Sequence, residues 1–96
     1  MKLEFKWDLA KEKINQRKHN VSFEEAKTVF LDDEVLLIPD PDHSLAEEPF
    51  VLLGMSQKGR VLLVCHCYRG DDQVIRIFSA RRADKQETNE YFSKRG

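Results

Sequence analysis

The sequence predicts an α+β domain in which an antiparallel sheet is packed by helices on one face. Two helix-start signals occur in the first third of the chain, and four short apolar runs joined by turn-forming residues follow. Strands joined by short turns pair antiparallel, and a further helical segment comes last. The 96 residues, 41% of them hydrophobic and 34% charged, suit a single domain over 1–96 with the order β-α-α-β-β-β-β-α.

Alternation and a capping residue define the first strand and the first helix. Apolar and charged residues alternate over 3–7, which is the period of a half-buried strand. Asp8 is suited to cap a helix over 9–19. We expect Leu9 and Ile14 to be the inward positions of this helix, because its other residues are mostly charged or polar.

A second helix begins soon after the first one ends. Asn20 tolerates the left-handed conformation that ends a helix. Ser22, with Glu25 three residues later, has the spacing of a capping box, and the helix stops at the acidic residues 32–34. Composition and turn residues then predict strands over 35–38, 50–55, 60–68 and 73–80 and a helix over 83–93.

Opposite charges are segregated along the chain, although the formal net charge is -1. Residues 1–20 carry six basic and three acidic side chains, whereas residues 21–59 carry two basic and nine acidic ones. If the basic ends of the chain fold together, they present a positive face to phosphate; the alternative is that they are solvated helix faces. The acidic segment 32–48 is either a dock for a basic partner or a solvated loop.

The sequence favours a cytoplasmic protein. No run approaches the roughly 18 apolar residues of a membrane span, and the first residues lack the apolar block of a signal peptide. Cys65 and Cys67 stand two positions apart, which is a poor loop for a disulfide. Reduced thiols fit the cytoplasm.

A polar face is predicted on the strand over 60–68. Alternation with period two places Arg60, His66 and Tyr68 on one side of this strand and both cysteines on the other. We expect the polar side to lie on the open face of the sheet, because the apolar side is suited to the core.

The register of the following hairpin decides which arginine joins this face. A loop over 69–72 sets His66 beside Ile75. Arg81 then reaches the same face. A loop one residue longer sets His66 directly across from Arg76 instead. The sequence leaves both registers open, but each brings a histidine, a tyrosine and at least one arginine together.

A sheet face with imidazole, phenol and guanidinium groups is suited to cutting RNA without a metal. Cleavage needs the 2′-hydroxyl deprotonated, the phosphorane charge stabilised and the 5′-oxygen protonated, and these side chains can supply those roles. The catalytic candidates are His66, Tyr68, Arg76 and Arg81. The alternative for His66 is a hydrogen-bonded structural residue.

Further basic side chains are candidates for holding the RNA backbone. Arginine binds two phosphate oxygens at once through its planar fork, and an arginine pair stands where the last strand gives way to the helix. The predicted RNA-binding residues are Lys18, His19, Arg60 and Arg82. The competing interpretation is that one arginine of the pair is tied locally to Asp84 or Glu87.

No metal or cofactor is expected. The residues of metal-binding type are Cys65, His66, Cys67, His19 and His43, but on a strand the two thiols point away from His66. Structural zinc sites normally use cysteine pairs on turns, separated by two to four residues, a spacing that this pair does not have.

Five short blocks distributed over nearly the whole chain form a specific pattern. They are FKWD (5–8), RKHNVSFEEA (17–26), DPDHS (40–44), GMS (54–56) and RIFSARRA (76–83). In this order and spacing they resemble the BrnT toxin family, the toxin half of bacterial type II toxin-antitoxin pairs. Two positions depart from the family pattern: Asn20 replaces the usual Gly, and Pro49-Phe50 stands where an arginine is usual.

The resemblance implies a compact RelE-like fold and a metal-independent endoribonuclease that arrests growth. It implies RNA as the substrate and an antitoxin with a ribbon-helix-helix domain as the neutralising partner. Operator DNA would be bound only by the toxin-antitoxin complex. The alternative that the residues leave open is a non-catalytic module of the same fold that binds an antitoxin or nucleic acid.

Overall fold

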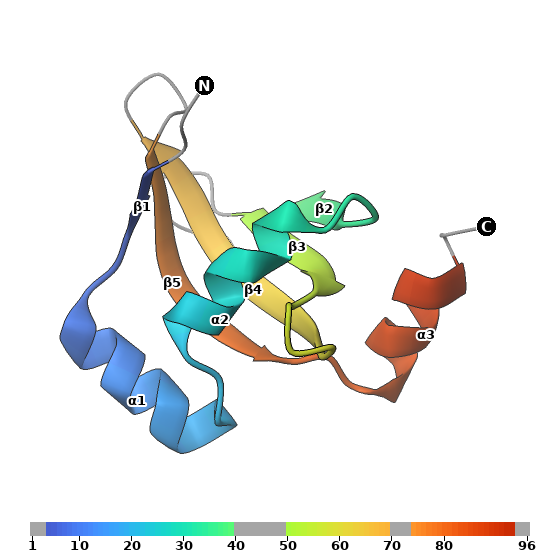
Figure 1. Cartoon of the computed structure of the whole chain (residues 1–96), viewed down its shortest axis with the longest axis horizontal. Helices are drawn as coiled ribbons and strands as arrows, with labels where there is room; N and C mark the ends of the chain where they lie inside the picture. The colour runs from blue at the N-terminus through green and yellow to red at the C-terminus, as the bar shows by residue number, and fades with distance from the viewer. Residues whose placement is uncertain (1–3, 40–49, 70–73, 94–96) are drawn as a thin grey trace.

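The computed structural model describes residues 4–39, 50–69 and 74–93. In chain order the elements are β1 (Glu4–Lys6), α1 (Leu9–His19), α2 (Phe23–Thr28), the 3-10 helix η1 (Val29–Leu31), β2 (Leu36–Pro39), β3 (Phe50–Met55), β4 (Val61–Arg69), β5 (Val74–Arg82) and α3 (Lys85–Ser93) (Figure 1). The predicted α+β class and element order are confirmed. No helix in these ranges is long and apolar enough to cross a membrane.

The five strands form one mixed sheet in the order β1-β5-β4-β3-β2. The strands β2 to β5 pair antiparallel with their neighbours in the chain, as predicted for strands joined by turns. β1 instead runs parallel to β5 at the far edge, so the expectation of an antiparallel sheet holds for four strands of the five. The helices α1, α2 and η1 and three strands separate β1 from β5 in the chain, and no short turn therefore dictates their relative direction.

α1 has the predicted caps but a different inward residue. Asp8 accepts hydrogen bonds from two backbone amides of the first turn at 2.8 and 3.1 Å, and Asn20 ends the helix with φ 57°. The expectation that Leu9 and Ile14 face inward is wrong, because they are 70% and 57% exposed. Asn15 is the buried residue of this helix.

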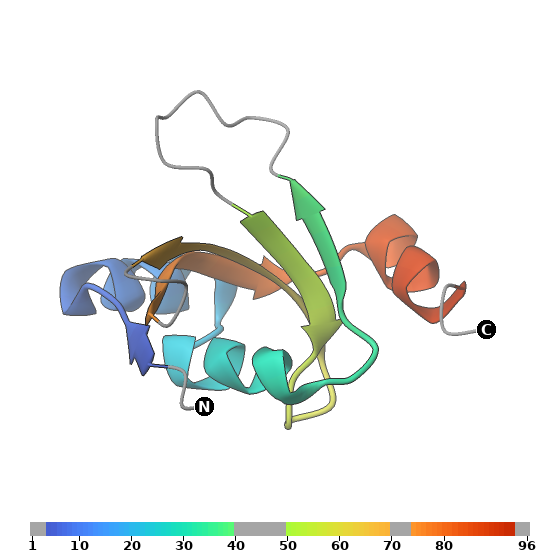
Figure 2. The ribbon, with the colours of Figure 1, turned by 90° about the horizontal axis from the view of Figure 1, so that it is seen from above.

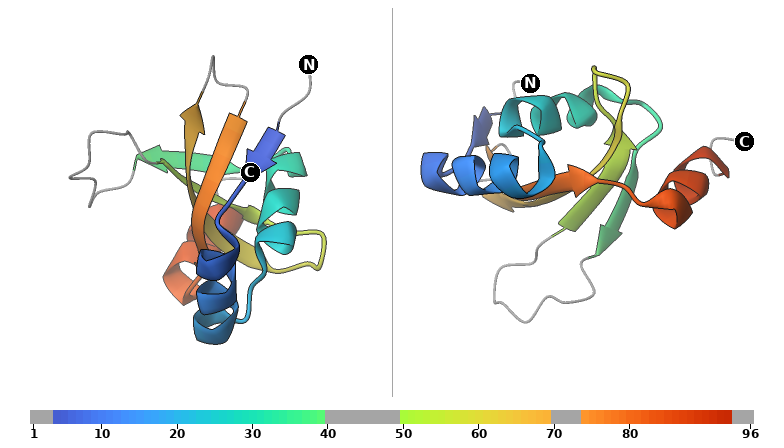
Figure 3. Two further views of the ribbon diagram at one scale, coloured as in Figure 1. Left: turned by 90° about the vertical axis from the view of Figure 1, so that its left-hand side faces the viewer. Right: turned by 90° about the horizontal axis from the view of Figure 1, so that it is seen from below.

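The amide of Asn15 takes the place of a neighbouring strand at the edge of β5. Its Nδ2 donates to the carbonyls of Val21 and Ala80 at 2.9 and 2.8 Å, and its Oδ1 accepts from the amide of Ala80 at 3.1 Å. β1 pairs with β5 over 74–76, so Ala80 lies beyond the end of β1. The three bonds satisfy this part of the edge and hold α1 beside β5 (Figure 3).

α2 begins at the predicted cap, but the acidic residue of the expected capping box is used elsewhere. The hydroxyl of Ser22 accepts a hydrogen bond from the amide of Glu25 at 3.0 Å. The carboxylate of Glu25 binds the guanidinium of Arg60 and accepts from the hydroxyl of Ser56 at 2.7 Å. It therefore ties α2 to the turn between β3 and β4.

The main core lies between the sheet and the layer of α2 and η1 (Figure 2). Its buried members are Val21, Phe23, Ala26, Val29, Leu52, Leu62, Val64, Ile75, Ile77 and Ala80. A smaller cluster on the opposite face joins Tyr91 of α3 to Leu53 and Leu63. The expectation that helices pack on one face is therefore wrong for α3, which covers one end of the other face.

A bulge in β5 shifts the register of the β4–β5 hairpin part of the way along its length. Cys65 pairs with Ser79. The next residue along β4, His66, pairs with Ile77, which leaves Phe78 as the extra residue on β5. Neither register predicted from the loop length is observed. At His66 the register follows from the pairing of Arg69 with Val74, which neither predicted loop contains, and the bulge shifts it by one more residue from Cys65 onward. Residues 70–73 of the loop lie outside the described residues.

Removing the buried amide should destabilise the protein. We expect Asn15→Ala to lower the free energy of unfolding by about 2–4 kcal/mol, because buried backbone groups of Val21 and Ala80 lose their partners. Urea unfolding of the wild type and the variant measures the difference. Gln16→Ala, at an exposed position of the same helix, is the control. A loss for Asn15→Ala no larger than that of the control would contradict the anchoring role.

Candidate functional site

A small hollow lies on the sheet face opposite α2, where β4 and β5 meet the end of α1. Its volume is about 120 Å³, and it is lined by His19, Val51, Leu63, Cys65, Ser79, Ala80 and Arg81. Two predicted site residues, His19 and Arg81, therefore meet in one concavity. His19 is the exposed last residue of α1, and the Asn15 anchor holds that helix beside β5.

The bulge also places Arg76 and Arg81 on the same face of the sheet. In an unbroken strand, residues five positions apart point to opposite faces. Here Arg76 pairs with Cys67 and Arg81 pairs with Leu63. Both partners are odd-numbered residues of β4 on the side of the hollow, so the two arginines share that side.

The guanidinium of Arg81 is held by the carboxylate of Glu87 at the rim of the hollow. Nη1 and Nη2 each donate to one carboxylate oxygen at 2.9 Å, and Nη1 also donates to the carbonyl of Arg82 at 3.2 Å. Among the described residues, the Nε edge has no partner. The hydrogen bonds between the two side chains raise the pKa of Arg81 and lower the pKa of Glu87.

Glu87 is itself fixed by the start of α3. Its Oε1 accepts from the amide of Asp84 at 2.9 Å, and the carboxylate of Asp84 accepts from the amide of Glu87 at 2.8 Å. This reciprocal pair is a capping box. The interpretation that one arginine of the pair is tied to Glu87 is confirmed for Arg81, whose guanidinium is thereby held in one orientation.

His66 and Tyr68 lie on the core side of the sheet. His66 is 0% exposed, and its ring meets that of Phe30 edge-on with centroids 4.9 Å apart. Its Nδ1 lies 3.1 Å from the carbonyl oxygen of Val64, and its Nε2 lies 3.4 Å from the hydroxyl of Tyr68. Burial lowers the pKa of His66. The expectation that these two residues share an open surface with an arginine is wrong, because the sheet separates them from the hollow.

Two of the other predicted RNA-binding residues, Arg60 and Arg82, lie apart from the hollow. The Nε of Arg60 donates to Glu25 at 2.9 Å, and its Nη2 donates to the carbonyl of Asn20 at 3.1 Å. Arg60 and Arg82 line a separate shallow depression of about 300 Å³ beside α3. Lys18 is exposed in the last turn of α1. The predicted set is thus not gathered at one place, because His19 lines the hollow and Arg60 and Arg82 line the depression beside α3.

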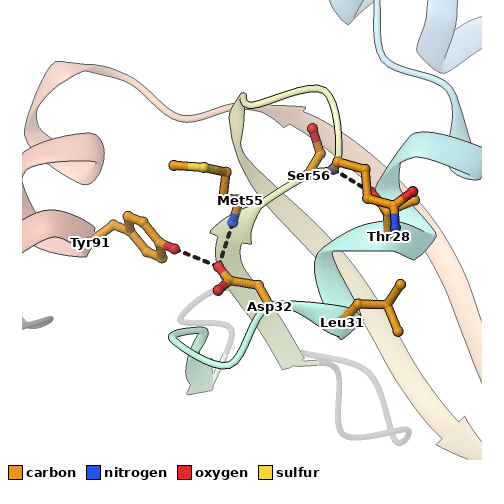
Figure 4. A pocket seen from close by; sticks show the side chains of 7 residues that line it. Thr28, Leu31, Asp32, Met55, Ser56 and Tyr91 are labelled. Carbon is orange, nitrogen blue, oxygen red and sulfur yellow. Dashed lines mark hydrogen bonds between the residues drawn. The ribbon is translucent and has the colours of Figure 1, made fainter.

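Another depression lies between η1, α3 and the β3–β4 turn (Figure 4). Its volume is about 290 Å³, and it is lined by Thr28, Leu31, Asp32, Met55, Ser56, Gln57 and Tyr91. Asp32 accepts from the amide of Met55 at 2.8 Å and from the hydroxyl of Tyr91 at 2.5 Å. Thr28 accepts from the amide of Gln57 at 2.9 Å. These contacts connect α3 and the turn to the α2–η1 segment, which is a structural role.

The residues considered for a metal are dispersed. Within the described ranges, no group of three or more His, Cys, Asp or Glu side chains is placed to hold a metal ion. Cys65 and Cys67 carry their thiols on the side of the hollow, whereas His66 points to the core. His43 lies outside the described residues.

Sequence reasoning did not find Ser79 and Cys65 at the site. Alternation assigned Cys65 to an apolar core face, but the structure leaves it half-buried at the hollow. Ser79 reaches the hollow through the bulge, which has no local sequence signal. For Glu87 a signal exists, since Asp-x-x-Glu before a helix is capping-box spacing and turns the second carboxylate back toward the end of the strand.

The fold and the hollow define a small α+β protein with a cationic site on the less covered face of a five-stranded mixed sheet. A profile of the family described as ribonuclease toxin, BrnT, of type II toxin-antitoxin system matches residues 7–87. The chain belongs to this family, which confirms the resemblance seen in the sequence. The family is one of ribonuclease toxins, and membership implies an RNA target and an antitoxin partner.

A solved structure has a similar fold. The BrnT ribonuclease toxin of Brucella abortus superposes with a TM-score of 0.67 at 18% sequence identity. The match covers 86% of this chain and 99% of the Brucella chain. No curated protein sequence matches this chain.

The buried imidazole should make stability depend on pH. A histidine whose folded pKa is lowered stabilises the protein fully above its unfolded pKa of 6.5, and the stabilisation is lost as the pH falls below that value. We expect the wild type to lose more stability between about pH 7 and pH 5 than His66→Phe, in which this group cannot charge.

Thermal unfolding at the two pH values measures this difference. His66→Gln is a second variant that keeps a hydrogen-bonding side chain, and His19→Gln removes an exposed imidazole as the control. Equal pH dependence in the wild type and in both His66 variants would show that His66 is accessible to protons in the folded protein.

Proposed function

We propose that this protein is a metal-independent endoribonuclease that binds the RNA backbone at the hollow of His19 and Arg81. The observation that carries the proposal is the guanidinium of Arg81, which Glu87 holds in one orientation beside the exposed imidazole of His19. Within the described residues, the Nε edge of this guanidinium has no partner. The Nε edge of an arginine can donate two parallel hydrogen bonds to a phosphate group. The hollow therefore offers a phosphate clamp and a group for proton transfer.

In this proposal each of the three side chains has a separate role. Arg81 stabilises the charge that develops on the phosphorane, and Arg76 contributes positive potential from the same face. His19 exchanges a proton with the 2′-hydroxyl or the 5′-oxygen. His19 takes the role first assigned to His66, because His66 is fully buried. His66 and Tyr68 support the sheet from its core side.

The finer features of the system belong to the same proposal, and family membership supports them. We assign the sheet to the RelE-like type and the site of action to the cytoplasm. The antitoxin is a ribbon-helix-helix protein that neutralises the toxin. The operator DNA is bound by the complex of the two proteins and not by this chain alone.

RNA cleavage by purified protein in the presence of EDTA tests the proposal. We expect cleavage by the wild type and a rate at least about 10²-fold lower for Arg81→Ala, because a charge-stabilising donor is lost. Arg81→Lys should not restore the rate, because lysine lacks the planar fork. His19→Ala should lose about 10²-fold or more. Lys58→Ala, which removes an exposed cation of the β3–β4 turn, is the control for lost charge.

The outcomes separate the proposal from its alternatives. Cleavage that EDTA abolishes and Mg²⁺ restores would contradict metal independence. Full cleavage by folded Arg81→Ala and His19→Ala would move the active site away from the hollow.

A non-catalytic binding module is the second candidate, because the imidazole of His66 is buried and the carboxylate of Glu87 already neutralises Arg81. That candidate predicts tight binding of the antitoxin and intact RNA with the wild type. Arrest of growth without loss of RNA, on expression of the protein alone, would favour it.

A further inference from the structure

Phe78 is the extra residue of the β5 bulge and lies on the same side of the sheet as the hollow. Ile77 and Ala80, which flank the bulge, both belong to the core cluster beneath α2. The two residues between them, Phe78 and Ser79, therefore both face the opposite side. Ser79 lines the hollow, so its immediate neighbour Phe78 stands at the border of the same site.

The ring of Phe78 is not used in the core. Within the described residues, neither apolar cluster includes it, and its side chain is partly exposed. By contrast Phe5, Trp7, Phe23 and Phe30 all pack in or against the main core. An aromatic side chain on a sheet face that contributes to no apolar cluster needs another explanation.

One cation lies over this ring, and two arginines lie on the same side of the sheet. The Nζ of Lys11, from α1, lies 5.7 Å from the ring centroid. Arg76 precedes Phe78 by two residues on the same side, and Arg81, which lines the hollow, follows it by three residues. A flat aromatic surface between phosphate-binding cations is the arrangement with which proteins hold single-stranded nucleic acid: the ring stacks on a base and the cations contact the backbone.

We propose that Phe78 is a stacking platform for one base of a single-stranded RNA whose backbone crosses the hollow. This inference rests on the proposed ribonuclease function and specifies its substrate class. A base inside a duplex is covered on both faces by its neighbours and cannot stack on Phe78. The RNA must therefore be single-stranded at this position, and the identity of the base matters little, since every base has a π-face.

Binding of a short, non-cleavable 2′-O-methyl oligonucleotide that carries 2-aminopurine tests the stacking. We expect the wild type to quench the base fluorescence on binding. Phe78→Ala should weaken binding about tenfold and abolish the quenching, and Phe78→Leu should resemble it. Phe78→Trp should bind at least as tightly as the wild type. In cleavage assays the Ala variant should raise KM more than it lowers kcat.

Two controls make the result specific. Leu37→Ala removes a large exposed side chain from β2, at the other edge of the sheet, and should bind like the wild type. An oligonucleotide with an abasic residue in place of 2-aminopurine should bind the wild type and Phe78→Ala equally. Thermal unfolding checks that the variants are folded.

The failure of this inference differs from the failure of the proposed function. If the wild type cleaves RNA and folded Phe78→Ala binds the oligonucleotide equally well, stacking is refuted and the ribonuclease stands. If duplex RNA binds as well as the single strand, the assigned substrate class is wrong. If the wild type neither binds nor cleaves single-stranded RNA, both proposals fall together.

Discussion

The bulge in β5 is the constraint on which the two faces of the sheet depend. Before the bulge, Ile75 and Ile77 point into the core, and after it Ala80 does so. The apolar set thus changes from odd to even positions, which keeps both halves of the strand packed beneath α2. The same change turns Arg81 to the side that Arg76 occupies. One irregularity in the backbone therefore serves core packing and assembles a cationic face.

The imidazole at this face is positioned by hydrogen bonds more than by apolar packing. The large apolar side chains of α1, Leu9 and Ile14, are exposed, and its buried residue is Asn15. A buried amide with three backbone partners specifies one position along β5, whereas an apolar stripe would tolerate sliding, because unmade bonds to buried groups are costly. His19 is the last residue before the left-handed turn at Asn20, so the place of α1 determines the place of the imidazole.

The helices could be predicted from the sequence because their signals are local. The cap at Asp8, the left-handed end at Asn20 and the cap at Ser22 each depend on residues within four positions. The pairing of strands depends on contacts between distant residues. The parallel pairing of Glu4 with Val74 has no counterpart in any turn signal.

The types of residue at the site could be predicted from the sequence, but which of those residues lie together could not. Alternation correctly placed His66 and Tyr68 on one side of β4, but it could not tell which side the helices cover. The basic ends of the chain suggested a positive face, and the structure brings His19 and Arg81 together at the hollow. To know which side chains face the hollow, one must know which side of the sheet α2 covers and where the bulge in β5 lies. Both are features of the tertiary structure.

Arg60 and Arg81 show how geometry separates a structural cation from one available to a ligand. Arg60 uses its Nε to bind a carboxylate that is 2% exposed, and its Nη2 also reaches a backbone carbonyl. Arg81 binds Glu87 through its terminal nitrogens and is 45% exposed. The pairing of Arg81 restricts its guanidinium to one orientation without using the Nε edge. A carboxylate beside an arginine therefore excludes phosphate in the first case and prepares a binding edge for it in the second.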